Sequence, residues 1–240
     1  MNPIQAQLAI PNREESSELP PNHSFALIMV KPHAFEQGID IPMSNLLGFV
    51  GKKSQVVIDN LRLDDETKGM LFENETFVPV TTFVRDTGEA GEKYKKVIDI
   101  MYGRDKDKRH YETLLERYRG KCAFFLMEYK GSQEEMEDAL RKLKGKETFT
   151  GETPGSGIRG AYVLPKVRLN LDALEKLPED EYRKKIGCVV DNAIHITDHA
   201  WETAEVLKLL LSEEEITSIE ERGFPIIEYI NTHEKKDNPL

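Results

Sequence analysis

The stretch SFALIMVKP, residues 24–32, decides which kind of fold this chain can form. It is a continuous apolar run that ends at Pro32, which is typical of a buried β-strand, and it delivers Lys31 at the end of that strand. CAFFLMEY, residues 122–129, has the composition of a second strong strand. Because helical segments alternate with strands in both halves of the chain, the sequence predicts an α/β sandwich.

Three longer helices are predicted from apolar stripes and from the residues at their ends. Residues 89–103 place apolar side chains on one face, and residues 109–120 close with a glycine. Residues 132–145 begin with a serine cap and acidic residues and finish with basic residues and a glycine, which suits the helix dipole at both ends. A shorter helix near residue 44 is expected to use Ser44 as its N-cap.

The segment between residues 53 and 88 is harder to interpret. SQVVIDNLRL, residues 54–63, and FVPVTTFVRD, residues 77–86, both have the composition of strands, and the residues between them favour a helix. One part of this segment is expected to be an insertion. Either residues 61–72 are extra and residues 77–84 form the second core strand, or the reverse holds.

Composition and charge exclude several classes of protein. The net charge of −10 argues against a nucleic-acid-binding protein, because affinity for the phosphate backbone comes from clustered Lys and Arg. Cys122 and Cys188 are too few for a disulfide framework, so we expect reduced cysteines and a cytoplasmic protein. No apolar run approaches the length of a membrane span. Residues 1–22 read as a flexible arm, residues 23–232 as one domain, and residues 233–240 as a polar tail.

A glycine-rich loop, KETFTGETPGSGIRG, occupies residues 146–160. Such a loop offers backbone amides, and Arg159 offers a planar guanidinium that pairs well with phosphate oxygens. Glycine, proline and serine also mark ordinary turns, and a single Lys at a strand end, such as Lys31, is usually solvated. From these residues alone, both the phosphate-binding interpretation and the structural one stay open.

The octapeptide NAIHITDH, residues 192–199, can be interpreted in three ways. His195 and His199 have the spacing of two metal ligands on one helical face, although no third ligand is obvious. They can equally be incidental histidines at the start of a helix that is capped by Thr197 or Asp198. As a third possibility, a neutral imidazole at position 195 can act as a nucleophile toward a phosphoryl group.

Three motifs taken together resemble the nucleoside diphosphate kinase family. ALIMVKPHA, residues 26–34, is similar to the family's first strand with its Lys-Pro ending, and residues 145–160 are similar to its glycine-rich loop. NAIHITDHAWETAE, residues 192–205, is similar to the segment that carries the family's catalytic His. The motifs occur in the family's order, and the resemblance covers most of residues 24–210.

The resemblance implies a ferredoxin-like βαββαβ core with an antiparallel sheet and inserted helical segments. It also implies ping-pong transfer of a terminal phosphate between nucleoside tri- and diphosphates, with a phosphohistidine at His195, Mg²⁺ bound to the nucleotide, and a homo-oligomer. The site residues that it implies are Lys31, Arg159 and Thr148 on the phosphates, Asn192 on the ribose, Tyr102 beside Lys31 and His195, Lys142 or Arg141 as a further phosphate contact, and His110 or Tyr111 against the base.

Several positions depart from the family's pattern. Ile196 stands where the family has a glycine after the catalytic His, and a β-branched residue lacks the backbone freedom of glycine. The family's orienting Glu corresponds to Val206 or Leu207, with Glu202 and Glu205 as possible substitutes. His33 replaces an Asp, and residues 161–190 form an extra segment. These departures leave an alternative open, a nucleotide-binding or regulatory protein that has lost turnover.

Overall fold

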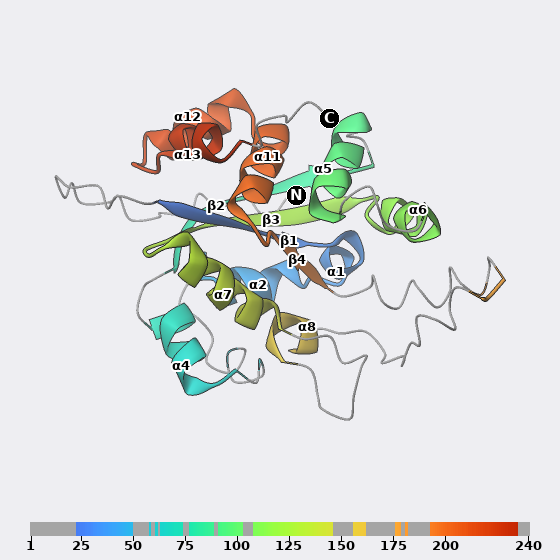
Figure 1. The fold of residues 1–240 in the computed structure, drawn as a ribbon, viewed down its shortest axis with the longest axis horizontal. Helices are drawn as coiled ribbons and strands as arrows, with labels where there is room; N and C mark the ends of the chain where they lie inside the picture. Colours follow the sequence, from blue (N-terminus) through green and yellow to red (C-terminus); the bar gives the residue numbers. More distant parts are fainter. Residues whose placement is uncertain are drawn as a thin grey trace.

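The computed structural model describes residues 23–49, 58, 61, 63–73, 77–88, 91–102, 108–145, 156–161, 176–178, 181 and 193–234. Figure 1 shows a central sheet with helices on both of its faces. The strands are β1 (Ser24–Val30), β2 (Phe77–Asp86), β3 (Lys121–Tyr129) and β4 (Ile194–Ile196).

The helices are α1 (Pro32–Glu36), α2 (Asp40–Leu46), α4 (Asp65–Lys68), the π-helical turn η1 (Gly69–Glu73), α5 (Glu92–Tyr102), α6 (Lys108–Arg117), α7 (Gln133–Lys144), α8 (Gly157–Ala161), α11 (Ala200–Leu210), α12 (Glu213–Glu220) and α13 (Ile226–His233). Among the described residues, no helix is long and apolar enough to cross a membrane.

The strands form a sheet of order β2-β3-β1-β4 in which each neighbouring pair is antiparallel. Helical segments separate β1 from β2, β2 from β3, and β3 from β4 along the chain. This order and these directions are those of a ferredoxin-like α/β sandwich, so the predicted fold class is confirmed. The central strands β1 and β3 pair from Ser24 opposite Tyr129 to Val30 opposite Ala123.

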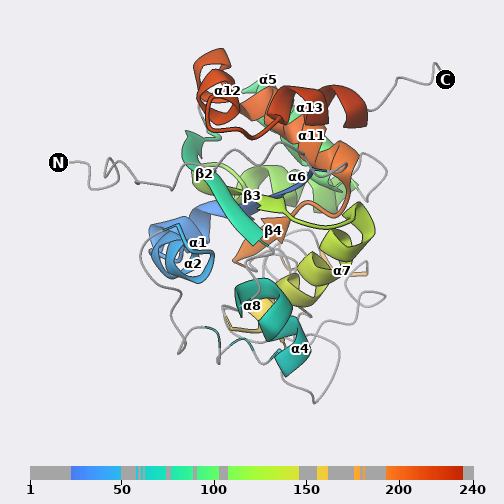
Figure 2. The same cartoon turned by 90° about the vertical axis from the view of Figure 1, so that its left-hand side faces the viewer.

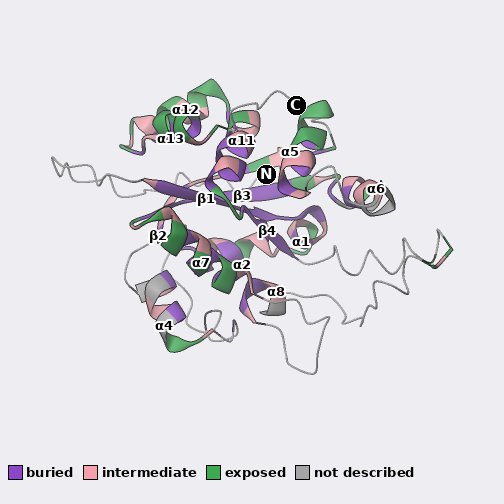
Figure 3. Ribbon diagram, viewed as in Figure 1, coloured by how far each residue is buried: buried purple, intermediate pink, exposed green. Residues whose placement is uncertain are grey.

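Strand alternation divides the interior into two cores. Phe25, Leu27 and Met29 of β1 face a core that includes side chains of α5, α11 and α13, whereas the residues between them face a second core that includes α2 and α7. Figures 1 and 2 show these two helical layers on opposite sides of the sheet, and Figure 3 shows that the central strands β1 and β3 between them are buried. Strands buried on both faces read as continuous apolar runs, which explains the pattern of residues 24–30.

The three longer helices predicted from the sequence are present as α5, α6 and α7. Ser132 caps α7 in a reciprocal capping box with Glu135, as its position predicted. The prediction for Ser44 was wrong, because α2 already begins at Asp40 and Ser44 lies inside the helix.

FVPVTTFVRD forms strand β2, as one of the two alternatives for residues 53–88 expected. The strand predicted for residues 54–63 is wrong where the structure describes it, since Ile58 is helical and Leu61 lies in a turn. The arm at residues 1–22 and most of the extra segment at 161–190 lie outside the described residues. Helix α13 ends at His233, where the predicted polar tail begins.

The start of α11 also differs from the prediction. Its N-cap is His199, which makes no side-chain cap. Thr197 instead extends the pairing of β4 with β1, since its hydroxyl accepts a hydrogen bond from the Leu27 amide at 3.1 Å and donates to the Leu27 carbonyl at 3.3 Å. The Thr203 hydroxyl, one turn into α11, donates to Thr197 at 2.7 Å. These bonds fix the start of α11 against the end of β4.

Candidate active site

His195 is the middle residue of β4 and pairs with Met29 of β1. Because side chains alternate along a strand, Ile194 and Ile196 point into the second core and His195 points toward α5 and α11. Ile196 is fully buried in extended backbone, a setting that β-branched residues favour. The isoleucine therefore packs the core beneath the histidine, and this backbone does not require glycine.

Glu202 orients the His195 ring. The Nε2 atom of His195 lies 3.0 Å from one carboxylate oxygen of Glu202, and the other oxygen accepts a hydrogen bond from the Asp198 amide at 2.8 Å. Both side chains are buried, at 4% and 5% exposure. The orienting glutamate that is missing at Val206 or Leu207 is thus supplied one turn earlier in the same helix.

The other ring nitrogen of His195, Nδ1, is buried and has no hydrogen-bond partner among the described residues. The Tyr102 ring packs beside the imidazole with its centroid 4.9 Å away, and the Tyr102 hydroxyl contacts that of Tyr118. A buried polar atom without a partner is costly and calls for an explanation, such as a group that only a ligand brings.

Burial lowers the pKa of His195 well below its usual value, and the nearby charges of Lys144, Lys31 and Arg159 lower it further. The ring is therefore neutral near neutral pH. Burial also raises the pKa of Glu202 to about 7. Once Glu202 is ionised it can only accept a hydrogen bond, so the imidazole proton is assigned to Nε2 and the lone pair to Nδ1.

Lys31 is held between two elements at the end of β1. Its amide donates to the Ala193 carbonyl at 3.0 Å, and its own carbonyl accepts from Ala34 and Phe35 as the N-cap of α1. The side chain is only 2% exposed, and its ammonium lies 5.0 Å from the centroid of the Tyr118 ring. The strand predicted from residues 24–32 thus brings a buried cation to the site.

Lys144 is a site residue that the sequence did not reveal. It ends α7, and its ammonium lies 2.6 and 2.8 Å from the two Asp198 carboxylate oxygens and 3.4 Å from the Ile196 carbonyl. The two residues that the resemblance offered for a further phosphate contact, Lys142 and Arg141, are 42% and 71% exposed and pair with Asp138 at 3.2 and 3.4 Å. The basic last turn of α7 was visible in the sequence, but the lysine that turns toward His195 depends on the phase of the helix.

Arg159 lies in α8, whose first residue crosses the end of α7 closely. A Cβ on Gly157 would lie 2.4 Å from the Leu143 carbonyl oxygen, and one on Gly145 would lie 1.8 Å from the Ser156 carbonyl oxygen. Both glycines also have positive φ, 73° at Gly145 and 64° at Gly157. This contact between backbones holds Arg159 near Lys144, and the charge of Arg159 acts on His195 and on Tyr118.

Other predicted positions fall away from this cluster or outside the described residues. Thr148 and Asn192 are not described, nor is the side chain of His110. The Tyr111 hydroxyl donates to Asp99.

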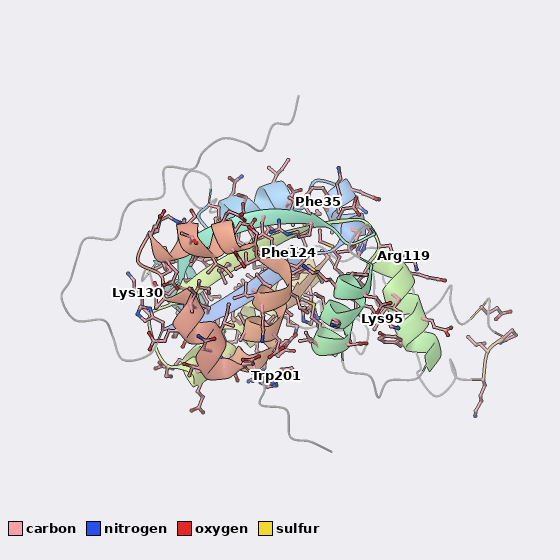
Figure 4. The ribbon with its side chains drawn as sticks, turned by 90° about the horizontal axis from the view of Figure 1, so that it is seen from above. Phe35, Lys95, Arg119, Phe124, Lys130 and Trp201 are labelled. Carbon is pink, nitrogen blue, oxygen red and sulfur yellow. The ribbon has the colours of Figure 1, made fainter. Side chains whose placement is uncertain are left out.

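His199 does not share a helical face with His195, since His199 is the N-cap residue of α11 and His195 lies in β4. Its side chain is 56% exposed, lies 3.7 Å from Glu137 and stacks on Trp201, which is the second residue of α11 and is labelled in Figure 4. The described residues contain no group of three or more acidic, Cys or His side chains placed to hold a metal ion. The premise of the metal interpretation, two histidines on one helix, was therefore wrong.

No protein-family model and no curated protein sequence matches the chain. Among solved structures, it is similar to a nucleoside-diphosphate kinase from Borrelia burgdorferi with bound vanadate and ADP, at 15% identity and a TM-score of 0.49 over 80% of this chain and 89% of that one. It is also similar to the Aquifex aeolicus enzyme, at 18% identity and a TM-score of 0.43 over 81% and 99% of the two chains. At such low identity, activity depends on the side chains of the site and does not carry over with the fold.

Proposed function

We propose that this protein is a nucleoside diphosphate kinase that moves the terminal phosphate of a nucleoside triphosphate to a nucleoside diphosphate through a phosphohistidine at His195. The observation that carries the proposal is the state of the His195 ring. Its Nε2 is taken by Glu202 at 3.0 Å, and its Nδ1 is buried without a partner among the described residues. A neutral ring oriented in this way directs one lone pair at an incoming electrophile.

In the first half-reaction, the Nδ1 lone pair forms a bond to the terminal phosphorus, and the bond from that phosphorus to the bridging oxygen breaks. The electron pair of the broken bond leaves with the nucleoside diphosphate. In the second half-reaction, a terminal oxygen of a different nucleoside diphosphate attacks the phosphohistidine, and Nδ1 recovers its lone pair. The Glu202 carboxylate stays hydrogen-bonded to Nε2 throughout and stabilises the positive charge that the ring gains.

Positive charge around His195 fits a polyphosphate substrate. Lys31, Lys144 and Arg159 reach the site from three different elements, and each lowers the pKa of His195 through its charge. Phosphoryl transfer asks mainly for such positioning and for stabilisation of negative charge. The same cations keep the ring unprotonated, so one cluster serves both the nucleophile and the phosphates.

The proposal includes Mg²⁺ that is bound to the phosphates of the nucleotide. Lys31, Lys144 and Arg159 supply cationic groups, and the Asp198 carboxylate is already paired with Lys144. A divalent cation that keeps its waters and is carried on substrate phosphates fits this set of side chains. Thr148 and Asn192 keep their expected roles as phosphate and ribose contacts within the proposal, and so does assembly into a homo-oligomer.

Incubation with ATP labelled on its terminal phosphate tests the proposal. The wild-type protein is expected to take up acid-labile phosphate and to release it on addition of a nucleoside diphosphate. His195→Ala is expected to take up none, whereas the exposed His199→Ala serves as the matched control and labels normally. Equal labelling of wild type and His195→Ala would contradict the proposal. Nucleotide binding without any labelling would favour the alternative of a protein that lacks turnover.

A further inference from the structure

A pocket that is separate from the His195 cluster, with a cavity volume of about 140 Å³, lies at the ends of α5 and α11 that are remote from His195. Met29 and Phe124 of the sheet form its floor, and Val97 of α5 and Leu209 and Leu210 of α11 form its apolar walls. Figure 4, which looks onto this face of the sheet, labels Phe124 between the two helices. The pocket shares no lining residue with the cluster around His195.

The Tyr94 hydroxyl gives this pocket a polar group at depth. Tyr94 lines the pocket, is 5% exposed, and its hydroxyl has no hydrogen-bond partner among the described residues. The neighbouring Thr87 hydroxyl has one hydrogen, which is directed at the carbonyl oxygens of Tyr118 and Gly120, and its oxygen accepts a hydrogen bond from the Gly120 amide at 3.0 Å. Burial raises the pKa of Tyr94, so the hydroxyl stays neutral and able to donate. Buried hydroxyls usually find a partner, and here a ligand atom would supply it.

The size of the pocket limits what it can hold. A cavity of about 150 Å³ lined by apolar side chains is known to take a benzene ring. The volume of about 140 Å³ and the apolar walls therefore fit one six-membered ring and exclude a nucleotide. Phe124, which already stacks with Phe83 at 5.1 Å between ring centroids, offers an aromatic surface to such a ring.

One cation at the rim of the pocket can meet an acidic substituent. Lys93 lines the pocket, is exposed, and forms no ion pair with the described residues. Arg85 is already engaged with the Leu210 carbonyl and with Glu215. Asp86 accepts a hydrogen bond from the Gly88 amide at 2.9 Å. The Lys93 ammonium is therefore the rim cation that can meet a carboxylate, while Tyr94 meets a polar atom at the buried end of the ligand.

We propose that this pocket binds a monocyclic aromatic carboxylate that carries a hydroxyl or carbonyl group opposite the carboxylate. The ring lies between the sheet and the helices α5 and α11, with its polar inner edge on Tyr94 and its carboxylate near Lys93. These two helices also carry Tyr102 and Glu202. The ligand would therefore contact elements of the His195 site without touching the site itself.

Calorimetric titration of the full chain with para-hydroxybenzoate, benzoate and phenol tests the proposal without any nucleotide. Saturable binding is expected to be tightest for para-hydroxybenzoate. Tyr94→Phe should weaken para-hydroxybenzoate about threefold to tenfold through the lost hydrogen bond and leave benzoate nearly unchanged. Lys93→Gln should weaken both carboxylates about twofold to fivefold and spare phenol, while Lys95→Gln on the same helix is the matched control.

The absence of saturable binding for every probe by the folded wild-type protein would overturn the proposal. So would binding that survives Leu209→Trp, a change that fills the cavity. Because Leu209→Trp could disturb folding, its thermal unfolding is measured alongside. The near-isosteric Tyr94→Phe gives an independent test. Equal affinity of wild type and Tyr94→Phe for para-hydroxybenzoate would also contradict the proposal.

Discussion

Replacing Glu202 with Gln perturbs the His195 site while nearly preserving its shape. The carboxylate now accepts two hydrogen bonds, from His195 Nε2 at 3.0 Å and from the Asp198 amide at 2.8 Å. The two bonds are accepted by different carboxylate oxygens, and a Gln amide has a single oxygen, so only one of the two can be kept. If that oxygen stays on Asp198, the amide NH₂ faces Nε2, which moves the ring proton to Nδ1 and removes the nucleophilic lone pair.

The size of the effect follows from the hydrogen bond that is lost. A hydrogen bond to a charged group contributes about 1.5–3 kcal/mol, and a rate changes tenfold for each 1.36 kcal/mol or so. Phosphorylation of His195 in Glu202→Gln is therefore expected to be about 10- to 100-fold slower. A variant that removed only a general packing contact would be destabilised instead, so rate and stability must be measured together.

Stability distinguishes the two cases through its dependence on pH. Burial raises the pKa of Glu202 from 4.5 to about 7. A carboxyl whose pKa is raised on folding stabilises the protein below its unfolded pKa, and this stabilisation is lost as the pH rises through the folded pKa. At about 1.36 kcal/mol for each pKa unit, the loss between pH 4.5 and 7 is about 3 kcal/mol. Gln does not titrate, so this part of the pH dependence should vanish in the variant.

Two measurements check this prediction. Rapid-quench labelling with ATP between about pH 6 and pH 8 should give a wild-type rate that rises with an apparent pKa near 7, whereas the slow rate of Glu202→Gln should lack that rise. Urea unfolding between about pH 4.5 and pH 8 should show a fall in wild-type stability with rising pH that is missing in Glu202→Gln. Glu205→Gln, on the same helix, is the control. A Glu202→Gln rate equal to that of wild type, with the same pH profile, would refute the role of Glu202.

Three further predictions follow from contacts around the site. Gly157→Ala should lower the free energy of unfolding by at least about 2 kcal/mol in urea, because the added Cβ would lie 2.4 Å from the Leu143 carbonyl oxygen. The control Gly91→Ala, where φ is 54° and the space is open, should lower it by about 1 kcal/mol. Lys144→Met should slow labelling of His195 about tenfold or more in the same quench assay, and the exposed Lys142→Met less than about twofold. Thr197→Val should cost about 1–3 kcal/mol of unfolding free energy, because the buried Leu27 amide loses its partner at 3.1 Å, whereas the exposed Thr217→Val should cost less than about 1 kcal/mol.

The sequence predicted the fold where local patterns and tertiary structure agree. Residues 24–30 and 122–129 are apolar because β1 and β3 are buried on both faces, so their composition alone identified them. Helix α7 was predicted well because its cap and its charges are local features. The strand predicted for residues 54–63 failed at Ile58 and Leu61 because buried apolar residues suit a helix or turn as well as a strand, and only packing decides between them.

The candidate site was predicted in part for the same reason. Lys31 and His195 lie at positions fixed by strand ends and strand alternation, so sequence order could locate them. Lys144 and Glu202 depend on the rotation of α7 and α11 about their axes, which the neighbouring elements set. Ile196 was expected to disturb the backbone of the site, because the sequence does not show that its side chain packs in the second core.

In the proposed reaction, His195 is a nucleophile through Nδ1 while Glu202 holds Nε2. The most direct measurement is the proton–nitrogen correlation spectrum of the phosphorylated protein with isotope-labelled histidine, which identifies the ring nitrogen that carries the phosphate. We expect a phosphate on Nδ1 of His195, which is lost in His195→Ala and kept in His199→Ala. The proposed reaction would be contradicted by a phosphate on Nε2 or on another residue. It would also be contradicted if the folded protein carried no phosphate after incubation with ATP and Mg²⁺.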